Sequence, residues 1–405
     1  MLKIGGTFGV VDIGSAKICC MIVHLRSDDS FDVLGVGYCA CRGVRAGVIV
    51  AMDDVCASLA KAVELAELEA KMRIECVVVN VSGAYFSSRF VSNMLEMHGR
   101  VITQSDVQRL LYKGIATDSG EDVLHHIPIL YSLDGVHGIR DPIGMVCQKL
   151  SVEMHIMSYS RSQLHNILVC LSRCHLEVAA IVSSSYALSL ACVDSDENNL
   201  IVIDFGAETT TICYIYKGIF CGSCVLERGG SALTERIAHS LNVSLSDAER
   251  IKTLYACAHV SLEDEYDFFL APVIDYNQDT HLKQVSKAFL NGIARDFVQT
   301  LVDEIGARIE SSVFRAGFCE NIIVTGGGIS LPGLTSMLSE RTKKVIHIKN
   351  IFLSPGSVEP SGTHAVCVGM ARFVCRHIHH MHSNLHNVGM RFFGKLLSLL
   401  GLSAK

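Results

Sequence analysis

The sequence has no tryptophan, only six prolines in 405 residues, and no long apolar run. A helix that spans a bilayer needs about 20 consecutive apolar residues, so we expect no transmembrane segment and a protein that is soluble or peripheral to a membrane. The N-terminus, from Met1 to Ile4, leads directly into a strand-like pattern and lacks the charged and apolar regions of a signal peptide. We therefore expect no secretory leader.

Clustered positive charge is also missing. The formal net charge is -6 at pH 7, and no basic stripe with interleaved aromatic residues occurs, so we expect no nucleic-acid binding. Hydrophobic residues make up 49% and charged residues 19%, which is typical of a folded protein rather than a disordered one. The length is sufficient for two or more core-forming domains.

Cysteine pairs at zinc-site spacing are absent, although the chain has 17 cysteines. Cys39-x-Cys41 and Cys221-x-x-Cys224 have no partner pair at that spacing. Many cysteines lie in apolar stretches, such as residues 18–21. Because free cysteine is among the most buried residue types, we expect reduced, buried thiols in a cytosolic protein.

Short buried strands and amphipathic helices alternate in the first half of the chain, which predicts an α/β fold. Expected strands there are residues 9–14, 18–25, 32–38, 76–81 and 178–183, and expected helices are residues 55–68, 162–174 and 184–192. Residues 82–158 interrupt this order with turn-rich sequence, a helix near 105–113 and strand-like pieces at 127–133 and 150–157. We interpret this segment as a small inserted α+β unit.

The strand pattern then begins again. Strands are expected at residues 200–206, 209–216, 219–225 and 321–324, and a helix at 332–341. The segments VDIGS (11–15) and IDFGA (203–207) match in residue type, and each precedes a hairpin-like pair of strands. Such a repeat predicts two similar halves whose Asp-x-Gly turns lie on opposite walls of one cleft.

These turns have the chemistry of phosphate-binding loops. Glycine and small residues let backbone N–H groups approach phosphate oxygens, and Asp12 and Asp204 are suited to hold Mg2+ through water. A third turn, residues 325–328, follows the strand at 321–324 and contains three consecutive glycines. Their missing side chains leave room for a nucleoside close to the backbone.

Together the three turns resemble the phosphate-1, phosphate-2 and adenosine motifs of the actin, sugar-kinase and chaperone ATPase superfamily. Within that superfamily the chain is similar to the FtsA family of bacterial cell-division proteins across nearly its whole length. The segments that carry this likeness are VIDFG (202–206), ERGG (227–230), SDAERIK (246–252), IVTGGG (323–328) with PGL (332–334), and in the insert VxxVSG (78–83) and HIPxxY (126–131).

The resemblance implies an actin-like α/β fold of two duplicated ribonuclease-H-like domains, divided into subdomains 1A, 1C, 2A and 2B. Subdomain 1C stands in place of actin's 1B, on the other side of the molecule. The expected boundaries are 1–81 and 159–192 for 1A, 82–158 for the SHS2-like insert 1C, 193–226 and 296–371 for 2A, 227–295 for 2B, 372–390 for a linker, and 391–405 for a membrane-targeting amphipathic helix.

The resemblance also implies two cofactors, ATP and Mg2+, and the residues that bind them. Residues expected at the phosphates are Asp12, Gly14, Ser15, Ala16, Lys17, Asp204, Gly206, Ala207, Glu208, Thr209, Gly229 and Gly230, with Asp12 and Asp204 near Mg2+. Residues expected at the nucleoside are Glu249, Lys252, Gly326, Gly327 and Gly328. Without the resemblance, Glu249 and Lys252 would be interpreted as a solvated ion pair on one helix face.

The second phosphate loop departs from the family pattern, Asp-x-Gly-Gly-Gly-Thr. Ala207 and Glu208 replace two glycines, and Glu208 brings a carboxylate to a place where phosphate is expected. Thr210 and Thr211 stand where an acidic residue is usual, and residues 183–186 (SSSY) offer no carboxylate or glutamine to position water. Hydrolysis needs such a group oriented on the nucleophile, so we expect weak ATPase activity at most and assign no catalytic residue.

The last fifteen residues, RFFGKLLSLLGLSAK (391–405), form an amphipathic pattern. Such a helix would be roughly 22 Å long, too short to cross about 30 Å of hydrocarbon, and its basic flanks suit the membrane interface. Residues expected at the membrane are Arg391, Phe392, Phe393, Lys395, Leu396, Leu397, Leu399 and Leu400. A terminal helix docked on the protein's own core is the alternative.

A histidine-rich stretch precedes this tail. Residues 377–387 carry five histidines among Met, Ser and Asn, which we interpret as part of the linker. His379, His380 and His382 are too close together in the chain for a rigid tetrahedral metal site, so we expect no metal there.

The resemblance implies an ATP-binding protein that polymerises through 1C-to-2B contacts on the cytoplasmic face of the inner membrane, at the division septum. It would tether FtsZ through a C-terminal FtsZ peptide on subdomain 2B and recruit later division proteins. Its partners would be FtsZ, copies of itself, anionic lipid and those later proteins. Two alternatives stay open: a pilus-assembly adaptor that shares the insert, and a sugar kinase of the same fold, for which no convincing catalytic aspartate is found.

Overall fold

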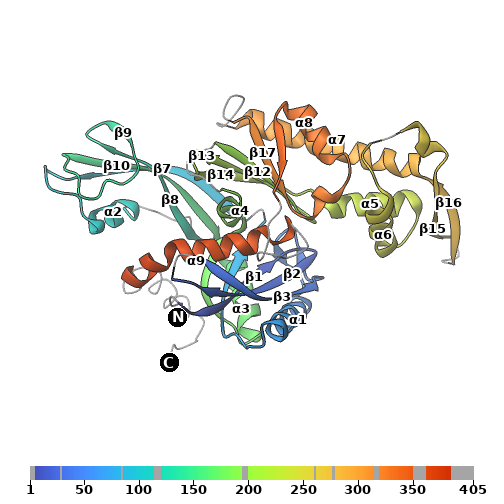
Figure 1. Cartoon of the computed structure of the whole chain (residues 1–405), viewed down its shortest axis with the longest axis horizontal. Helices are drawn as coiled ribbons and strands as arrows, with labels where there is room; N and C mark the ends of the chain where they lie inside the picture. Colours follow the sequence, from blue (N-terminus) through green and yellow to red (C-terminus); the bar gives the residue numbers. More distant parts are fainter. Residues whose placement is uncertain are drawn as a thin grey trace.

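Two five-stranded sheets form the centres of two domains, and a four-stranded sheet forms an insert in the first domain (Figure 1). A computed structural model describes residues 5–27, 30–83, 85–113, 120–193, 199–259, 261–275, 279–312, 319–349 and 362–384. None of the helices in these ranges is both long enough and apolar enough to cross a membrane. Each cysteine is buried or half-buried, as its apolar neighbours predicted.

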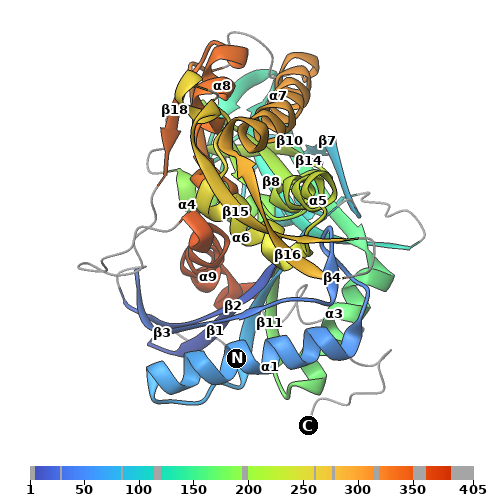
Figure 2. The ribbon, with the colours of Figure 1, turned by 90° about the vertical axis from the view of Figure 1, so that its right-hand side faces the viewer.

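The first domain is built on a sheet with the strand order β11-β6-β1-β2-β3. Helices cover both faces of this sheet (Figure 2), and strands with two covered faces are apolar almost throughout. Its elements are β1 (Thr7–Ile13), β2 (Lys17–Leu25), β3 (Phe31–Ala40), β6 (Cys76–Val81) and β11 (Glu177–Ser183), a short hairpin of β4 (Val44–Arg45) and β5 (Val48–Ile49), and the helices α1 (Met52–Ala70) and α3 (Arg161–Arg173).

The second domain repeats this topology. Its sheet has the order β14-β13-β12-β17-β18. On one side of β12 the neighbouring strands pair antiparallel and on the other side they pair parallel, as they do around β1. The internal duplication predicted from the two Asp-x-Gly segments is therefore confirmed. The strands are β12 (Leu200–Phe205), β13 (Thr210–Tyr216), β14 (Ile219–Leu226), β17 (Asn321–Thr325) and β18 (Val345–Ile348).

Helices and a hairpin extend the second domain away from its sheet. The long helix α7 (Lys287–Ser311) begins where the Ser286 hydroxyl accepts from the Phe289 N–H over 3.3 Å. It buries a continuous apolar face in the domain core. The other elements are α5 (Gly230–Leu241), α6 (Leu245–Tyr255), β15 (Phe268–Ile274), β16 (Thr280–Ser286), α8 (Leu334–Thr342) and the 3-10 turns Leu262–Glu265, Gly327–Ser330 and Gly362–His364.

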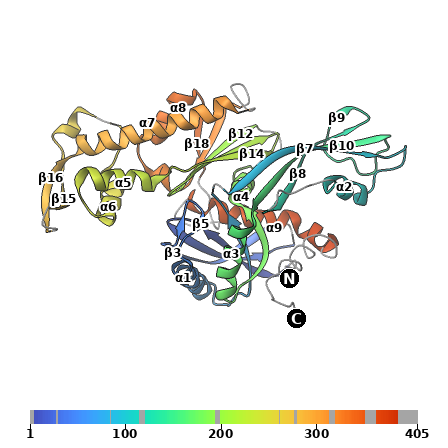
Figure 3. The ribbon, with the colours of Figure 1, turned by 180° about the vertical axis from the view of Figure 1, so that it is seen from behind.

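The insert and the β15–β16 hairpin lie at opposite ends of the longest axis of the molecule (Figures 1 and 3). The insert has the strand order β7-β10-β8-β9 and its own apolar core. Its helix begins with a capping box, in which the Thr103 side chain accepts from the Asp106 N–H and the Asp106 side chain accepts from the Thr103 N–H. The elements are β7 (Phe86–Glu96), α2 (Gln104–Leu111), β8 (Glu121–Leu133), β9 (Val136–Ile139) and β10 (Lys149–Ser160).

Two helices join the domains. α4 (Ser184–Cys192) packs against α9 (Ala365–Asn384), and both contribute to a core that contains residues of β1 and β2 as well as β12 and β13. The helices approach so closely that a Cβ atom at Gly369 would lie 1.8 Å from the Ala187 carbonyl oxygen. The two sheets are thus anchored to one shared helical layer.

Helix α9 crosses the boundary that the sequence predicted between subdomain 2A and the linker, at residues 371 and 372. Residues 365–371 were assigned to subdomain 2A and residues 372–390 to a linker, but α9 is one helix that continues to Asn384 and packs on the first domain's sheet. Val374 and Cys375 are buried in this contact. Their burial stabilises the helix. It could not be predicted from the neighbouring residues in the sequence, because it depends on tertiary contacts.

The rest of the expected linker and the amphipathic tail lie outside the described residues. His377, the first of the five histidines, belongs to α9, and its Nδ1 lies 2.8 Å from the Phe373 carbonyl oxygen. The backbone of His379, His380 and His382 is also part of this helix.

Candidate functional site

The Asp-x-Gly segments form two turns of the same geometry. Between β1 and β2, the Gly14 N–H donates to the Lys17 carbonyl over 3.1 Å. Between β12 and β13, the Gly206 N–H donates to the Thr209 carbonyl over 2.9 Å. A Cβ atom at Gly14 would lie 2.9 Å from the Lys17 carbonyl oxygen, and one at Gly206 would lie 2.8 Å from the Thr209 carbonyl oxygen. Both turns therefore require glycine.

The two turns line one cavity of about 530 Å³, to which both domains contribute. Every residue expected at the phosphates or the nucleoside lines this cavity: Asp12, Gly14, Ser15, Ala16, Lys17, Asp204, Gly206, Ala207, Glu208, Thr209, Gly229, Gly230, Glu249, Lys252, Gly326, Gly327 and Gly328. The fold thus brings five separate segments of the chain to one place.

Two carboxyl groups in this cavity are hard to ionise. Burial raises the pKa of Asp12 to about 6, although the Lys17 charge and a hydrogen bond from Asn80 both act to lower it. Burial, followed by repulsion from Asp12, raises the pKa of Asp204 to about 7. A cation between them would relieve this repulsion and favour the ionised forms.

The aspartate pair fits the chemistry of Mg2+. This ion prefers oxygen ligands and keeps part of its water shell, so one or two carboxylates are enough to hold it. In the described part of the chain, no cluster of three or more His, Cys, Asp or Glu is arranged to hold a metal ion. The expectation that the histidine-rich stretch holds no metal concerns side chains that lie largely outside the described residues.

Asn80 holds Asp12 in place. Its amide Nδ2 donates to Asp12 Oδ1 over 2.6 Å and to the Ser184 hydroxyl over 3.0 Å, and its Oδ1 accepts from the Ile13 N–H over 2.7 Å. Sequence reasoning missed this residue. An amide inside the apolar strand CVVVNV was the visible sign, because a buried amide needs hydrogen-bond partners.

Glu249 and Lys252 form an ion pair in which the lysine is mostly buried and the glutamate is exposed. The Lys252 ammonium lies 2.7 Å from Glu249 Oε2, 2.8 Å from the Thr234 hydroxyl and 3.1 Å from the Gly230 carbonyl oxygen. The Lys252 side chain keeps 17% of its surface exposed. The pair therefore connects α6 to the start of α5 at the wall of the cavity.

Close backbone contacts explain the glycines after β17 and before α5. Gly326 has φ 93°, and a Cβ atom there would lie 2.5 Å from Asp204 Oδ1. At Gly328 it would lie 2.9 Å from Phe205 Cβ, and at Gly229 it would lie 2.4 Å from the Ala207 carbonyl oxygen. These glycines let three loops pack tightly around the second aspartate.

Several lining residues were not predicted from the sequence. They come from the end of β6, from α4 and α5, from α6 and the residue after it, from α7, and from the chain after β17: Ser82, Ser184, Ser231, Leu233, Thr253, Ala256, Phe297, Leu301, Ser330, Leu331, Pro332, Gly362 and Thr363. Leu233, Phe297 and Leu301 belong to helices whose periodicity predicts only a buried face, so no local pattern distinguishes a cavity-lining Phe297 from an ordinary core residue.

The structure places the residues that depart from the family pattern in and near the β12–β13 turn. The Glu208 carboxylate is turned towards the first domain, where it accepts a hydrogen bond from the Ala46 N–H. In the SSSY segment, Ser184 lines the cavity and its hydroxyl donates to the Val81 carbonyl over 3.1 Å. Ser183 and Ser185 are buried.

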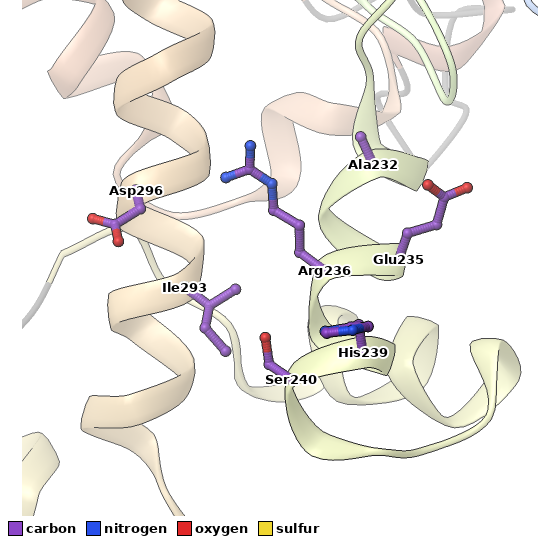
Figure 4. Close-up of a pocket in the computed structure, with 7 residues that line it drawn as sticks. All are labelled: Ala232, Glu235, Arg236, His239, Ser240, Ile293 and Asp296. Atoms are coloured by element: carbon purple, nitrogen blue, oxygen red, sulfur yellow. The ribbon is translucent and has the colours of Figure 1, made fainter.

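A second hollow, of about 510 Å³, lies between α5 and α7 (Figure 4). Arg236 extends into the space between the helices, and Ile293 projects towards it from α7, which also supplies the lining residue Asp296. The remaining lining residues are Ala232, Glu235, His239 and Ser240.

Comparison with known proteins identifies the family. The model of the family described as "Cell division protein FtsA" matches residues 201–368, and that of the "SHS2 domain inserted in FTSA" matches residues 83–158. The chain is 34% identical to the cell division protein FtsA of Rhizobium meliloti over 344 residues, which cover 80% of this chain and 77% of that one.

The chain belongs to the FtsA family of cell-division proteins. FtsA of Agrobacterium fabrum is 32% identical over 339 residues, with 80% of this chain and 76% of that one covered. FtsA of Escherichia coli is 25% identical over 334 residues, with 80% of each chain covered. The SHS2 match coincides with the insert, from the end of β6 to β10.

Solved structures show that this FtsA family member has an actin-like fold. The PilM-PilN type IV pilus biogenesis complex contains a chain with a TM-score of 0.65 at 17% identity, covering 91% of this chain and 98% of that chain. MreB5 of Spiroplasma citri bound to ADP has a TM-score of 0.57 at 11% identity, covering 93% and 98%. The expected fold class is confirmed for the described residues.

Proposed function

We propose that this FtsA family member binds Mg·ATP in the cavity between its two domains. The observation that carries the proposal is the pair of identical glycine turns, each with its aspartate, on two sheets of the same topology. Their backbone N–H groups suit phosphate oxygens, and the glycines at 326–328 leave space for the nucleoside. MreB5, which shares this fold, has been solved with ADP and with AMPPNP.

Different residues of the cavity would contact different parts of the nucleotide. Gly14 to Lys17, Gly206 to Thr209, and Gly229 with Gly230 would surround the phosphates, while Glu249, Lys252 and residues 326–328 would contact the nucleoside. Asp12 and Asp204 would hold Mg2+, which neutralises phosphate charge. Asn80 orients Asp12 and favours its ionised form.

Hydrolysis would be slow in this site. The residues that follow β11 are serines, and Ser184 already donates to the Val81 carbonyl. A serine hydroxyl without a base does not activate water efficiently. ATP would act mainly as a structural ligand that holds the two domains together.

Membership of the FtsA family supports a tethering role. The protein would polymerise through contacts between the insert and subdomain 2B, at opposite ends of the molecule (Figure 3). It would bind the C-terminal peptide of FtsZ on subdomain 2B, where the hollow between α5 and α7 offers a docking surface, and would recruit later division proteins.

The C-terminal tail would attach this assembly to the cytoplasmic face of the inner membrane at the septum. Residues 391–405 would lie in the interface, with Phe392, Phe393 and the leucines in the lipid and Arg391 and Lys395 near anionic headgroups. Burying five or six large apolar side chains is favourable by about 1.5–3 kcal/mol each before the cost of ordering the tail.

Co-sedimentation with anionic liposomes tests the tether. Purified FtsZ and Mg·ATP would be mixed with either the full chain or a chain that ends at Val388. We expect FtsZ in the lipid pellet with the full chain only, because the truncated chain retains the FtsZ site but lacks the anchor.

Two other outcomes would contradict parts of the proposal. If the full chain binds lipid but leaves FtsZ in solution, the function is that of an adaptor such as the pilus-assembly type. If neither chain binds lipid, the tail docks on the protein's own core.

A further inference from the structure

Glu208 belongs to the second domain, yet its carboxylate reaches the first. Its Oε2 accepts a hydrogen bond from the backbone N–H of Ala46, in the turn between β4 and β5. Glu208 itself lies in the β12–β13 turn, between the cavity-lining residues Ala207 and Thr209. The bond therefore links the second-domain wall of the cavity to a turn of the first domain that packs beside the cavity-lining Ser82.

The turn that supplies the N–H is firmly held. Ala46 and Gly47 have φ values of 47° and 82°, so the chain reverses tightly here. The turn also packs on the end of β6, since a Cβ atom at Gly83 would lie 2.2 Å from the Ala46 carbonyl oxygen. Ser82, next to this contact, lines the cavity. The Ala46 N–H is thus a fixed donor of the first domain, beside the cavity rather than in its lining.

A carboxylate in a phosphate loop has two opposite effects. A freely moving Glu208 would repel phosphate and weaken nucleotide binding. When Glu208 accepts the Ala46 N–H, its charge is directed towards a hydrogen-bond donor. A hydrogen bond to an ionised acceptor is stronger than a hydrogen bond to a neutral acceptor. The bond also fixes the loop before any ligand arrives, which reduces the ordering needed on binding.

We propose that Glu208 is a positioning residue that joins the two domains through the Ala46 backbone and holds the phosphate-2 loop ready for nucleotide. The inference rests on the proposed nucleotide site. It predicts that the acceptor oxygen of Glu208, rather than its charge, is what the site needs. Two substitutions separate these properties: Glu208→Gln keeps a carbonyl acceptor without charge, whereas Glu208→Ala removes both.

Amide hydrogen exchange of the full chain without nucleotide tests the bond itself. We expect the Ala46 amide to exchange at least about fivefold faster in Glu208→Ala than in the unsubstituted protein, and to remain largely protected in Glu208→Gln, because loss of the acceptor exposes the N–H to water. Glu340→Ala, which removes an exposed glutamate of α8, should leave this amide unchanged. Equal exchange at Ala46 in all four proteins would overturn the proposal.

Mg·ADP affinity, measured by calorimetry on the same proteins, tests the consequence. We expect Glu208→Ala to bind Mg·ADP at least about threefold more weakly than Glu208→Gln, because the two neutral variants differ in the acceptor that holds the loop. If Glu208→Ala binds as well as Glu208→Gln, the bond does not position the loop. If the unsubstituted protein does not bind Mg·ADP, the nucleotide function fails, while the Ala46 exchange rates still decide whether the domains are joined.

Discussion

Single residues decide what the cavity can hold. Asp12 and Asp204 come from equivalent strands of two duplicated sheets, and both have raised pKa values because they are buried. Asn80 and Lys17 partly offset this cost at Asp12. Without a cation the folded protein keeps protons on these groups that the unfolded chain has lost. Its stability should therefore fall as pH rises from about 4 to about 7.

Bound Mg·ADP should reverse this trend. At pH 5.5 the carboxyl groups with pKa values of about 6 and about 7 hold protons, and protonated carboxyl groups bind Mg2+ poorly. At pH 8 both are ionised. We expect the shift in thermal midpoint caused by Mg·ADP, measured by differential scanning calorimetry, to be clearly larger at pH 8 than at pH 5.5.

Asp204→Asn is the variant that isolates this effect. It removes the group with the higher pKa, so the Mg2+-dependent part of the shift should shrink and lose most of its pH dependence. ADP without Mg2+ serves as the control. A shift that is the same at both pH values in the unsubstituted protein would show that these carboxylates do not bind the cation.

At the scale of elements, the contact between α4 and α9 determines how the domains are joined. Gly369 in α9 touches the Ala187 backbone of α4 so closely that no side chain fits. Gly292 in α7 is also a helical glycine, but a Cβ atom there would meet nothing within 4 Å. The two positions form a matched pair, because the chemical change is the same and only the surroundings differ.

Substituting alanine at these two glycines should have opposite effects. Gly369→Ala should destabilise the protein by about 1–3 kcal/mol or more, because the helices must separate. Gly292→Ala should stabilise it by about 0.5–1 kcal/mol, because alanine favours a helix. Urea unfolding followed by circular dichroism measures both. Equal effects of the two substitutions would mean that α4 and α9 are not in close contact.

At the scale of the whole molecule, the insert is docked on both domains rather than attached by its termini alone. Phe220 of β14 stacks on His155 of β10, with ring centroids 5.5 Å apart. His125 of β8 accepts from the Ser183 N–H over 3.0 Å and lies 5.0 Å from the Tyr186 ring. Burial lowers the pKa of His125 to about 3 and that of His155 to about 4, so both histidines are neutral near pH 7 and support apolar packing.

Phe220→Ala should loosen this junction selectively. Truncating a buried phenylalanine costs about 3–5 kcal/mol, and here the cost falls on the contact between insert and second domain. We expect faster amide exchange in β8 and β10, with β17 much less affected. Phe268→Ala, at an exposed position on β15, is the control. Equal acceleration in β17 would mean that Phe220 supports the second domain as a whole.

Much of this protein could be predicted from sequence because its main features are local. The strand that ends in Asp-x-Gly is an apolar run followed by a turn residue, and its recurrence predicted the duplicated topology. The glycines at 326–328 allow the backbone to pass close to other groups, and this property follows from the residue type alone. The resemblance to the family was carried by segments of this kind. Their residue types suit both the turn that they form and the ligand that the turn is expected to bind.

Other features depended on the tertiary structure. Residues 372–390 were expected to be a linker, but their first part, which includes the buried Val374 and Cys375, is helical as part of α9. Glu208 was recognised as an unusual charge, but only the fold supplies the Ala46 N–H that it accepts. Likewise, only the fold brings Phe297 and Leu301 of α7 to the cavity. The sequence by itself determined the repeated turns and the chemistry they carry, because these depend on neighbouring residues. The tertiary structure decided which side chains meet across the cleft, because those partners lie far apart in the chain.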